Sequence, residues 1–598
     1  MRALFPLVFT LAAAAADFEP ASLIRLHPMG GQAGTEVEIE ILGTRLDGTT
    51  GVEFDCADLE WLRFTKRETG VVAGVLRIAP AAAPGGHMLR VMTALGPTSS
   101  LLFNVGRYPA LVEEKGREVR QLPVEIYGRL DGAADIDVYR FPVKAGERWV
   151  FDLRAMEHGS AVESRMMLLD PKGVRIAYND DRNHYDENPL IEHVFAQDGI
   201  HTVKLDQYRG PRGFTFGKNN AYVLRISALP VIRSINPLGA RRGSVTRFTI
   251  QGSGLADAKR AYLTQARRGD YARMTYPYTM PVRFEPDPAH GSEVPRIEGR
   301  VTGRTAEFAI PAQAAAGLWR LWIDGDAGAA EGPSVEIGEL PEFNEGDPAA
   351  LRESAYSING VLSAPRERDV HQVMGHAGEP LHVWTLSAQL GGPQLDTVLL
   401  LRSKDGSKLS EDDDVVAGWG GLLGNPDSSL FYTPKQDGPL LLEVRDRLNR
   451  GGPDYAYRLK VERRAPGFQL FTTPENFVVK KGTESVIKVH LVRESGFTDE
   501  VEVRMEGLPA EMTPPKHTFR RDQLFEPNAD GADMIIPEIA LRVRGDLPPG
   551  VHRIRILGKA PGGAAAQAHT ATMIGPIYHG DWNFYRRPVP GLTLTVVE

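Results

Sequence analysis

Two acidic pairs are the residues of this sequence best suited to chemistry, Asp180–Asp181 and Asp413–Asp414. Adjacent carboxylates repel one another, and a bound hard cation such as Ca²⁺ relieves that repulsion. Neighbouring residues of a regular strand point to opposite faces, so such a pair can hold one ion only from a loop or a bulge. The alternative is that these aspartates are solvated turn residues, because Asp also favours turns through local hydrogen bonds.

The sequence offers little that points to catalysis. Ser485 and Lys488 match a Ser-x-x-Lys motif, but in an alternating strand their side chains would project to opposite faces. The chain contains no Gly-x-Ser-x-Gly, His-Glu-x-x-His or Gly-x-x-x-x-Gly-Lys run, which are typical of serine hydrolases, zinc peptidases and P-loop proteins. We therefore predict no catalytic residues.

Cys56 is the only cysteine, so no disulfide can form within the chain. It lies in the alternating run 52–56, which favours a buried, inert thiol.

A stretch rich in Arg and Tyr spans residues 259–278. Cations interleaved with aromatic rings could stack on sugars or hold an acidic polymer. The alternative is an ordinary hairpin whose Arg and Tyr side chains cover a neighbouring domain.

Two sequence patterns, which contain most of these residues, each occur twice along the chain. The run starting at Pro28 returns at Pro237, a displacement of 209 residues. A second set of matches is displaced by 232 or 233 residues and includes Gly128 with Gly360, Asp137 with Asp369, Ala145-Gly146-Glu147 with Ala377-Gly378-Glu379, and Asp180 with Asp413. Between the matches the chain alternates apolar and polar residues and is punctuated by Gly, Asp and Pro, a pattern typical of short β-strands. The sequence therefore predicts two copies of a two-domain unit.

We predict an all-β chain of tandem β-sandwich domains, five in a row. Residues 1–16 carry the pattern of a secretory signal peptide, with Arg2 before an apolar run and small residues at 14–16. The five domains that follow have the expected bounds 17–107, 108–228, 229–339, 340–464 and 465–598.

Composition narrows the function classes. The 598 residues are 42% hydrophobic and 24% charged, with 62 Gly and 43 Pro, which describes an ordered, turn-rich chain rather than a disordered one. A formal net charge of −8 makes nucleic acid a poor expected partner. Beyond the leader, no run of apolar residues is long enough for a transmembrane segment.

The second repeat resembles the bacterial pre-peptidase C-terminal (PPC) domain, a secreted jelly-roll-like sandwich often appended to peptidases. The resemblance rests on Gly128 and the runs 135–141, 144–147, 168–173 and 179–181, and the second copy departs from it at Glu367 and His371. The domains at 17–107 and 229–339 resemble the IPT/TIG immunoglobulin-like family. The last domain resembles an immunoglobulin or fibronectin sandwich, and the whole arrangement resembles large exported proteins of planctomycete-type bacteria.

The PPC resemblance implies a calcium site. Related domains of collagenases bind calcium with a segment rich in Glu and Asn before the first strand, together with an Asp pair. The matching positions here are Glu113 and Glu114 in the first copy, and Glu342, Asn344 and Glu345 in the second, with Asp180–Asp181 and Asp413–Asp414 as the pairs.

From these features we expect a secreted, non-enzymatic binding or adhesion protein, located outside the cell, on its surface or in the periplasm. Its partner would be an extracellular glycan, surface polymer or protein. The alternative is an accessory or targeting subunit of an exported peptidase or other hydrolase. Ca²⁺ is the one cofactor expected.

Overall fold

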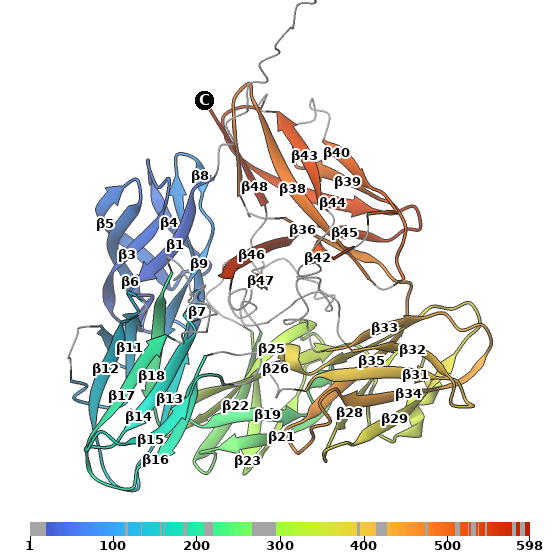
Figure 1. Cartoon of the computed structure of the whole chain (residues 1–598), viewed down its shortest axis with the longest axis horizontal. Coiled ribbons are helices and arrows are strands. Elements are labelled where there is room, and N and C mark those ends of the chain that lie inside the picture. Colours follow the sequence, from blue (N-terminus) through green and yellow to red (C-terminus); the bar gives the residue numbers. More distant parts are fainter. Residues whose placement is uncertain are drawn as a thin grey trace, which may run out of the picture.

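A computed structural model describes the chain at residues 20–113, 118–132, 134–155, 158, 160, 162–182, 188–207, 219–265, 295–390, 395–413, 427–472, 476–494, 496–508, 515–523, 526–527, 534–535, 538–544, 547–567, 569–576, 582–586 and 592–598. The predicted leader, residues 1–16, lies outside these ranges. The described residues form β-sheets and short 3-10 helices, with no α-helix among them. None of the helices in these ranges has the length and apolar character needed to cross a bilayer. The fold is thus all-β, as predicted (Figure 1).

The first domain packs two sheets, ordered β1-β3-β6-β5 and β2-β9-β7-β4. Its strands are β1 (Ser22–His27), β2 (Gly30–Gln32), β3 (Glu36–Thr44), β4 (Gly51–Phe54), β5 (Leu59–Glu68), β6 (Val71–Ile78), β7 (Gly85–Thr93), β8 (Gly96–Pro97) and β9 (Leu101–Gly106). The third domain has the same neighbours in the same order, except that pairing of β22 with β23 joins the two halves into one eight-stranded sheet. Its strands are β19 (Val231–Asn236), β20 (Gly239–Arg241), β21 (Val245–Ser253), β22 (Ala258–Gln265), β23 (Arg296–Thr302), β24 (Thr305–Ala309), β25 (Gly317–Gly325) and β26 (Gly328–Gly338).

The second and fourth domains share another strand order. The second has sheets β10-β11-β18-β13-β16 and β12-β17-β14-β15, built from β10 (Ala110–Val112), β11 (Val124–Arg129), β12 (Ile136–Val143), β13 (Arg148–Arg154), β14 (Ser164–Leu169), β15 (Arg175–Asn179), β16 (Leu190–Val194), β17 (Gly199–Gln207) and β18 (Ala221–Ser227). The fourth has sheets β27-β28-β35-β30-β33 and β29-β34-β31-β32. Its elements are β27 (Glu342–Asn344), η3 (Pro348–Arg352), β28 (Tyr356–Val361), β29 (Arg368–Gly375), β30 (Leu381–Leu386), η4 (Ala388–Leu390), β31 (Thr397–Arg402), β32 (Lys408–Asp412), β33 (Ser429–Tyr432), β34 (Gly438–Asp446) and β35 (Ala456–Arg463).

The fifth domain has main sheets β43-β38-β36-β46-β47 and β37-β48-β44-β39-β40. Its strands are β36 (Phe468–Thr472), β37 (Asn476–Lys480), β38 (Glu484–Arg493), β39 (Val501–Glu506), β40 (Lys516–Phe519), β41 (Glu526–Pro527), β42 (Met534–Ile535), β43 (Glu538–Arg544), β44 (Gly550–Lys559), β45 (Ala565–Gln567), β46 (His569–Pro576), β47 (Trp582–Arg586) and β48 (Leu592–Val597).

Alternation of side chains explains why these segments are strands with one buried face. In β12 every second residue from Asp137 to Val143 is buried, and the residues between them are exposed or half-buried. This is the period of two expected of a strand with one buried face. The tight turns that follow need glycine. Gly146 and Gly378, equivalent residues of the second repeat, have φ values of 87° and 77°, in the left-handed region that side chains disfavour.

The apolar cores cross two of the domain boundaries. The core of the first domain includes Tyr127 and Val223 of the second, and the core of the third includes Trp384 and Leu386 of the fourth. Strand β9 is buried along its whole length, because the second domain covers its outer side. Part of the apolar core of the first and third domains is therefore completed by the domain that follows, while the second and fourth domains also have cores of their own.

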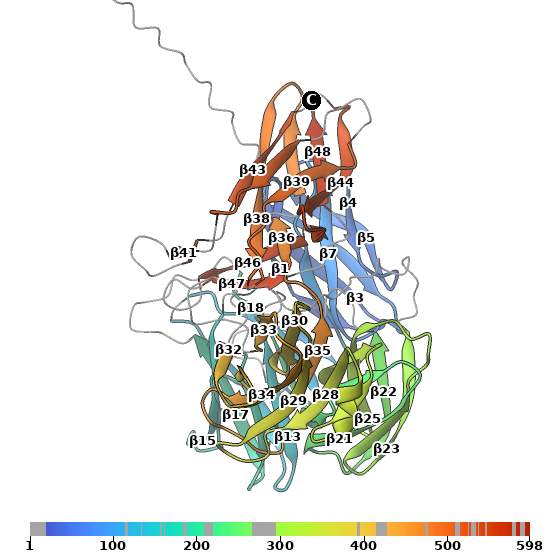
Figure 2. The same cartoon turned by 90° about the vertical axis from the view of Figure 1, so that its right-hand side faces the viewer.

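The chain does not extend as a row of domains but returns on itself. Figure 1 shows the path running from the first domain through the others to the fifth, which lies beside the first, and Figure 2 shows the fifth domain above the third and fourth. Asn476 at the start of β37 donates hydrogen bonds from Nδ2 to the carbonyl oxygens of Ala21, at 3.3 Å, and of Pro97. Tyr108, after the first domain, donates to the carbonyl oxygen of Ala327 in the third at 2.8 Å.

Candidate metal site

Each copy of the second repeat contains a pair of carboxyl groups packed against each other. In the second domain Glu113 follows β10, and its backbone N–H donates to the carbonyl oxygen of Tyr127 on β11 at 2.9 Å. Its side chain accepts a hydrogen bond from the backbone N–H of Arg129 at 2.9 Å and lies against the carboxyl group of Asp137 on β12. The pair thus joins one strand from each sheet of the sandwich.

The fourth domain repeats this arrangement residue for residue. Glu345 follows β27, its backbone N–H donates to the carbonyl oxygen of Asn359 at 3.0 Å, and its side chain accepts from the backbone N–H of Val361 at 3.3 Å. Its carboxyl group lies against that of Asp369 on β29. The displacement from Glu113 to Glu345 and from Asp137 to Asp369 is the same 232 residues that relates the two domains.

A tyrosine orients the aspartate of each pair. Tyr222 on β18 donates to Asp137 Oδ2 at 2.5 Å, and Tyr457 on β35 donates to Asp369 Oδ2 at 2.7 Å. Each tyrosine hydroxyl has a further neighbour, Tyr139 at 2.7 Å in one domain and His371 at 2.8 Å in the other. Since each tyrosine donates its proton to the aspartate, it accepts from this neighbour.

The carboxyl pairs are crowded with negative charge. Burial and the hydrogen-bonded Glu113 raise the pKa of Asp137 to about 8, and Asp135 adds to the effect. Burial and the adjacent Asp369 raise the pKa of Glu345 to about 7. A carboxyl group with so high a pKa holds its proton near neutral pH because a second negative charge next to the first is unfavourable. A cation in the proton's place would remove the same repulsion.

The acidic turn pairs lie elsewhere in the same domains. Asp180 and Asp181 follow β15, whereas Asp137 lies on β12 at the opposite edge of that four-stranded sheet. With strands about 4.8 Å apart, three strand spacings put these groups about 14 Å from each other. One ion therefore cannot be held by Glu113 and this pair together, and the same strand order, β29-β34-β31-β32, separates Asp413 from Glu345.

Several predicted ligands are engaged by other partners. Asp180 Oδ2 accepts a hydrogen bond from Tyr178 at 2.9 Å, and Asp413 lies 3.8 Å from the guanidinium of Arg447. Glu342 is bound through both carboxylate oxygens by Arg458. Asn344 is the last residue of β27, and its carbonyl oxygen accepts from Asp347. Glu114 and Asp414 lie outside the described residues.

The Arg/Tyr-rich stretch is described only up to residue 265. Tyr262 stacks on Trp322 of β25 with ring centroids 6.1 Å apart and an interplanar angle of 11°. The guanidinium of Arg296 lies 3.5 Å from the centre of the Tyr262 ring, and Arg107, from the linker after the first domain, lies 5.7 Å from that of Trp322. Tyr262 is buried. In the described part of this stretch, Lys259 and Arg260 are exposed and pair with Asp326 and Asp324 of the same domain. Tyr262 packs within the third domain, and Arg107 contacts Trp322 from outside that domain.

Comparisons with known proteins return solved structures of β-sandwich domains. The pre-peptidase C-terminal domain of a collagenase from Bacillus anthracis is 17% identical, covering 21% of this chain and 99% of that one, with a TM-score of 0.15. The N-terminal four Ig domains of Dscam1 isoform 7.44 are 8% identical, covering 90% and 95%, also with a TM-score of 0.15. Fibronectin(III)-like modules of Clostridium thermocellum CbhA are 14% identical, covering 32% and 86%, with a TM-score of 0.12. No protein-family model and no curated protein matches the chain. Sequence identities and TM-scores this low provide no information about function.

Proposed function

We propose that this chain is an exported, non-enzymatic binding or adhesion protein whose β-sandwich domains present their loops to an extracellular glycan, surface polymer or protein. The proposal rests mainly on the closed arrangement of the domains. Side chains bridge each boundary, for example Arg464 to Glu494 between the fourth and fifth domains at 2.8 Å, and Ser253 to Glu192 between the third and second at 2.6 Å. Loops held in a fixed relative geometry allow several weak contacts with one partner to add.

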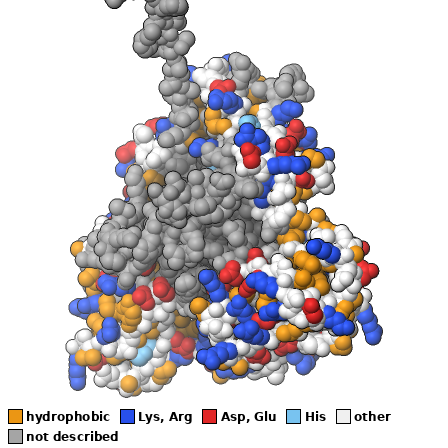
Figure 3. Space-filling model, turned by 45° about the vertical axis from the view of Figure 1, so that its right-hand side comes forward, with side chains coloured by type: hydrophobic (Ala, Val, Ile, Leu, Met, Phe, Trp, Pro, Cys, Tyr) orange, Lys and Arg blue, Asp and Glu red, His pale blue; other side chains and the backbone are white. Residues whose placement is uncertain are grey.

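The distribution of charged side chains on the surface favours a partner that is recognised by local contacts rather than by long-range attraction. On the face shown in Figure 3, Lys and Arg side chains are interspersed with Asp and Glu. Among the side chains described on that face, such a mixture gives no extended field of one sign, so these side chains do not favour nucleic acid through attraction of a polyanion over a distance. The export part of the proposal rests on the residue pattern at 1–16 alone.

We assign the PPC type to the second and fourth domains and the IPT/TIG type to the first and third as part of this proposal. It rests on the sequence motifs and on the matching strand orders within each pair. The carboxyl pairs then become calcium sites. Glu113 and Asp137 with Asp135, and Glu345 and Asp369 with Glu367, supply only oxygen donors, which suits Ca²⁺. Bound calcium would join the segment before the first long strand to the second sheet in each domain.

Calcium binding is tested by thermal unfolding with CaCl₂ or a chelator. We expect Ca²⁺ to raise the melting temperature, because a ligand that binds only the folded state stabilises it. Replacing Glu113→Gln together with Glu345→Gln removes this rise, while without calcium the variant is as stable as the wild type or more so, since a carboxylate has left each crowded pair. The matched control Asp180→Asn with Asp413→Asn keeps the full calcium response. A response that persists in the first variant and vanishes in the second would place calcium in the acidic turns instead.

The binding function is tested with three assays on the same purified chain. A binding protein is retained by whole cells or extracellular polysaccharide of its source in the absence of other proteins. An accessory subunit, the second candidate, instead co-purifies with an enzyme from the native extracellular or periplasmic fraction. Turnover of a pooled peptide and sugar substrate panel by the chain alone would refute the non-enzymatic assignment.

A further inference from the structure

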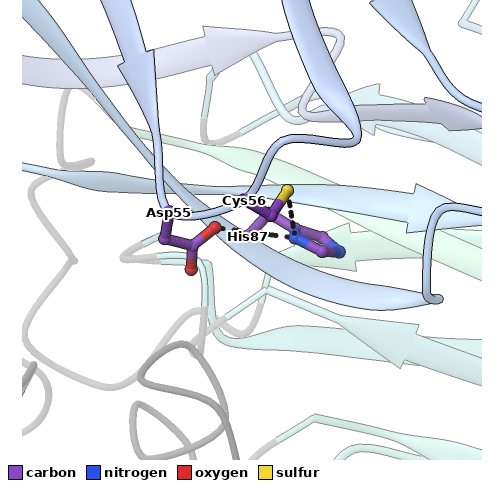
Figure 4. Close-up of side chains that lie close together, drawn as sticks. All are labelled: Asp55, Cys56 and His87. Carbon is purple, nitrogen blue, oxygen red and sulfur yellow. Dashed lines mark hydrogen bonds and ion pairs between the residues drawn. The ribbon is translucent and has the colours of Figure 1, made fainter. Parts of the chain in front are cut away.

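Three side chains of the first domain that are all metal-ligand types converge outside the sites described above. Asp55 and Cys56 lie in the short loop between β4 and β5, and His87 lies on β7 (Figure 4). Strands β4 and β7 pair with Phe54 opposite Leu89, and the backbone N–H of Asp55 donates to the carbonyl oxygen of Met88 at 3.1 Å. This continuation of the ladder fixes the loop beside His87. Cys56 is thus not part of an inert alternating strand.

The donor atoms have the spacing of a metal site before any ion is added. Cys56 Sγ lies 3.1 Å from His87 Nδ1, Asp55 Oδ1 lies 3.5 Å from the same nitrogen, and all three donors lie within 4.8 Å of one another. In tetrahedral zinc coordination, bonds of about 2.3 Å to sulfur and about 2.0–2.1 Å to nitrogen or oxygen put neighbouring donors about 3.4–3.6 Å apart. The two separations from His87 Nδ1 differ from these values by a few tenths of an ångström, and Cys56 Sγ and Asp55 Oδ1 lie within 4.8 Å of each other.

The imidazole is already oriented as a ligand. His87 Nε2 lies 2.7 Å from the carbonyl oxygen of Ala83, which can only accept, so Nε2 carries the hydrogen. The lone pair of Nδ1 then faces Cys56 and Asp55. A ligating histidine commonly donates its second ring N–H to a backbone carbonyl in this way.

One further observation indicates that this position suits a cation. Asp55 Oδ1 is buried, lies 3.5 Å from His87 Nδ1 and accepts no hydrogen bond, although buried polar atoms are almost always satisfied. A bound cation would satisfy this oxygen.

We propose that Cys56 Sγ, His87 Nδ1 and Asp55 Oδ1 together bind one zinc-class divalent cation. A thiolate and an imidazole suit Zn²⁺ and not Ca²⁺, which takes oxygen ligands. The thiol proton is released on binding, and the histidine binds as the neutral Nε2–H form. Three protein ligands leave the fourth position of a tetrahedral ion to water or to a donor from a partner. Cys56 is partly exposed, so the ion can reach it from solvent.

The single cysteine makes the test specific. In the wild-type chain we expect one equivalent of Zn²⁺ to abolish labelling of Cys56 by a thiol reagent, and a chelator to restore it. Substitution with Co²⁺ should produce the visible d–d bands of tetrahedral coordination together with a thiolate-to-cobalt charge-transfer band. Full labelling in the presence of zinc, or cobalt spectra of the octahedral aqueous type, would overturn the proposal without any variant.

Variants assign the ligands. Cys56→Ser removes the charge-transfer band, and Asp55→Asn weakens zinc binding, whereas the control Glu53→Gln, which alters an exposed ion pair with Arg90, leaves both unchanged. Equal zinc affinity in Asp55→Asn and Glu53→Gln would exclude Asp55 as a ligand and overturn the three-residue site. The calcium-dependent rise in melting temperature should be unaffected in Cys56→Ser, so failure of the zinc site and failure of the calcium proposal are separable.

Discussion

Arg458 is the residue on which the boundary between the third and fourth domains depends. Its side chain is fully buried, with Nε 2.6 Å from Glu336 Oε2 and Nη1 2.7 Å from Glu342 Oε2, and Lys460 also binds Glu336. In the first unit Asn104 donates to the hydroxyl of Tyr127 at 3.2 Å, and this hydroxyl donates to Glu125 Oε2 at 3.1 Å. Glu125 is buried and paired with Arg225 at 2.8 Å. Both copies thus place a buried carboxylate with an arginine at this boundary, and the first adds an amide and a tyrosine hydroxyl that meet between the domains.

Removing the guanidinium of Arg458 should be costly. We expect Arg458→Met to lower the free energy of unfolding by about 3–5 kcal/mol, because it leaves Glu342 without its counter-charge and Glu336 with Lys460 alone. Urea unfolding followed by tryptophan fluorescence measures this, since Trp319 and Trp384 are buried near that boundary. The control is Arg247→Met, which breaks an exposed pair with Glu307 and should cost at most about 1 kcal/mol. Similar losses in the two variants would contradict the role given to the buried network.

Glu336 should make the stability of this boundary depend on acid. Burial alone would raise its pKa, but Lys460 and Arg458 lower it from 4.5 to about 2. A carboxyl group whose pKa is lower in the folded than in the unfolded state stabilises the fold above the unfolded pKa and loses that contribution as pH falls through the folded one. The wild type should therefore lose stability between pH 4.5 and pH 2 more steeply than Glu336→Gln does. Urea midpoints across that range measure the difference, and parallel curves would count against it.

The carboxyl pairs show what residue types alone could predict. Glu113 and Glu345 were named from the sequence, and the displacement of 232 residues that relates them also relates Asp137 to Asp369. Asp137 and Asp369 are therefore detectable as partners that recur in both copies. What the sequence could not supply is that the turn aspartates after β15 and β32 lie at the far edge of their sheets, because strand order in a sandwich does not follow chain order.

At the scale of elements, one glycine in each two-domain unit allows the two domains to pack closely against each other. Gly30 on β2 and Gly239 on β20 are equivalent in the first repeat. A Cβ on Gly30 would lie 2.4 Å from Tyr127 Cε1 and 2.4 Å from the carbonyl oxygen of Asn104, and one on Gly239 would lie 2.5 Å from Arg458 Cζ. Both positions require the following domain to approach the bare backbone.

We expect Gly30→Ala and Gly239→Ala each to destabilise the chain by about 1–3 kcal/mol, the usual cost of overfilling a packed site. Gly51→Ala is the matched control, since Gly51 also lies in a strand but a Cβ there would meet nothing within 4 Å. Differential scanning calorimetry of the three variants measures the effect. A control as unstable as the other two would show that glycine in a strand, rather than the domain contact, sets the cost.

Strands and turns were the most predictable elements. Alternation of apolar and polar residues correctly indicated an all-β chain, and turn glycines such as Gly146 and Gly378 occupy the backbone conformation that demands them. The cluster of Asp55 and Cys56 with His87 was not predicted, because residues 31 positions apart meet only through the pairing of β4 with β7. Local patterns define strands but not which strands become neighbours.

At the scale of the whole molecule, the contact between the fifth and first domains should control the overall dimensions. Asn476→Asp keeps the side-chain shape but replaces the amide donor with a carboxylate facing two carbonyl oxygens. Because the repulsion is buried, we expect the fifth domain to separate from the first and the radius of gyration from small-angle X-ray scattering to increase. The control Asn449→Asp, at an exposed turn, should leave it unchanged. An unchanged radius of gyration in both variants would mean that other contacts are sufficient to hold the fifth domain against the first.

The return of the fifth domain to the first has a mechanical consequence. If the protein is anchored through one of these domains and its partner pulls on the other, the tension first shears the contact at Asn476 rather than stretching the linkers between consecutive domains. Only after this contact gives way would the chain lengthen and pass the load to the remaining boundaries. The protein would thus be stiff under weak pulling and extensible under strong pulling.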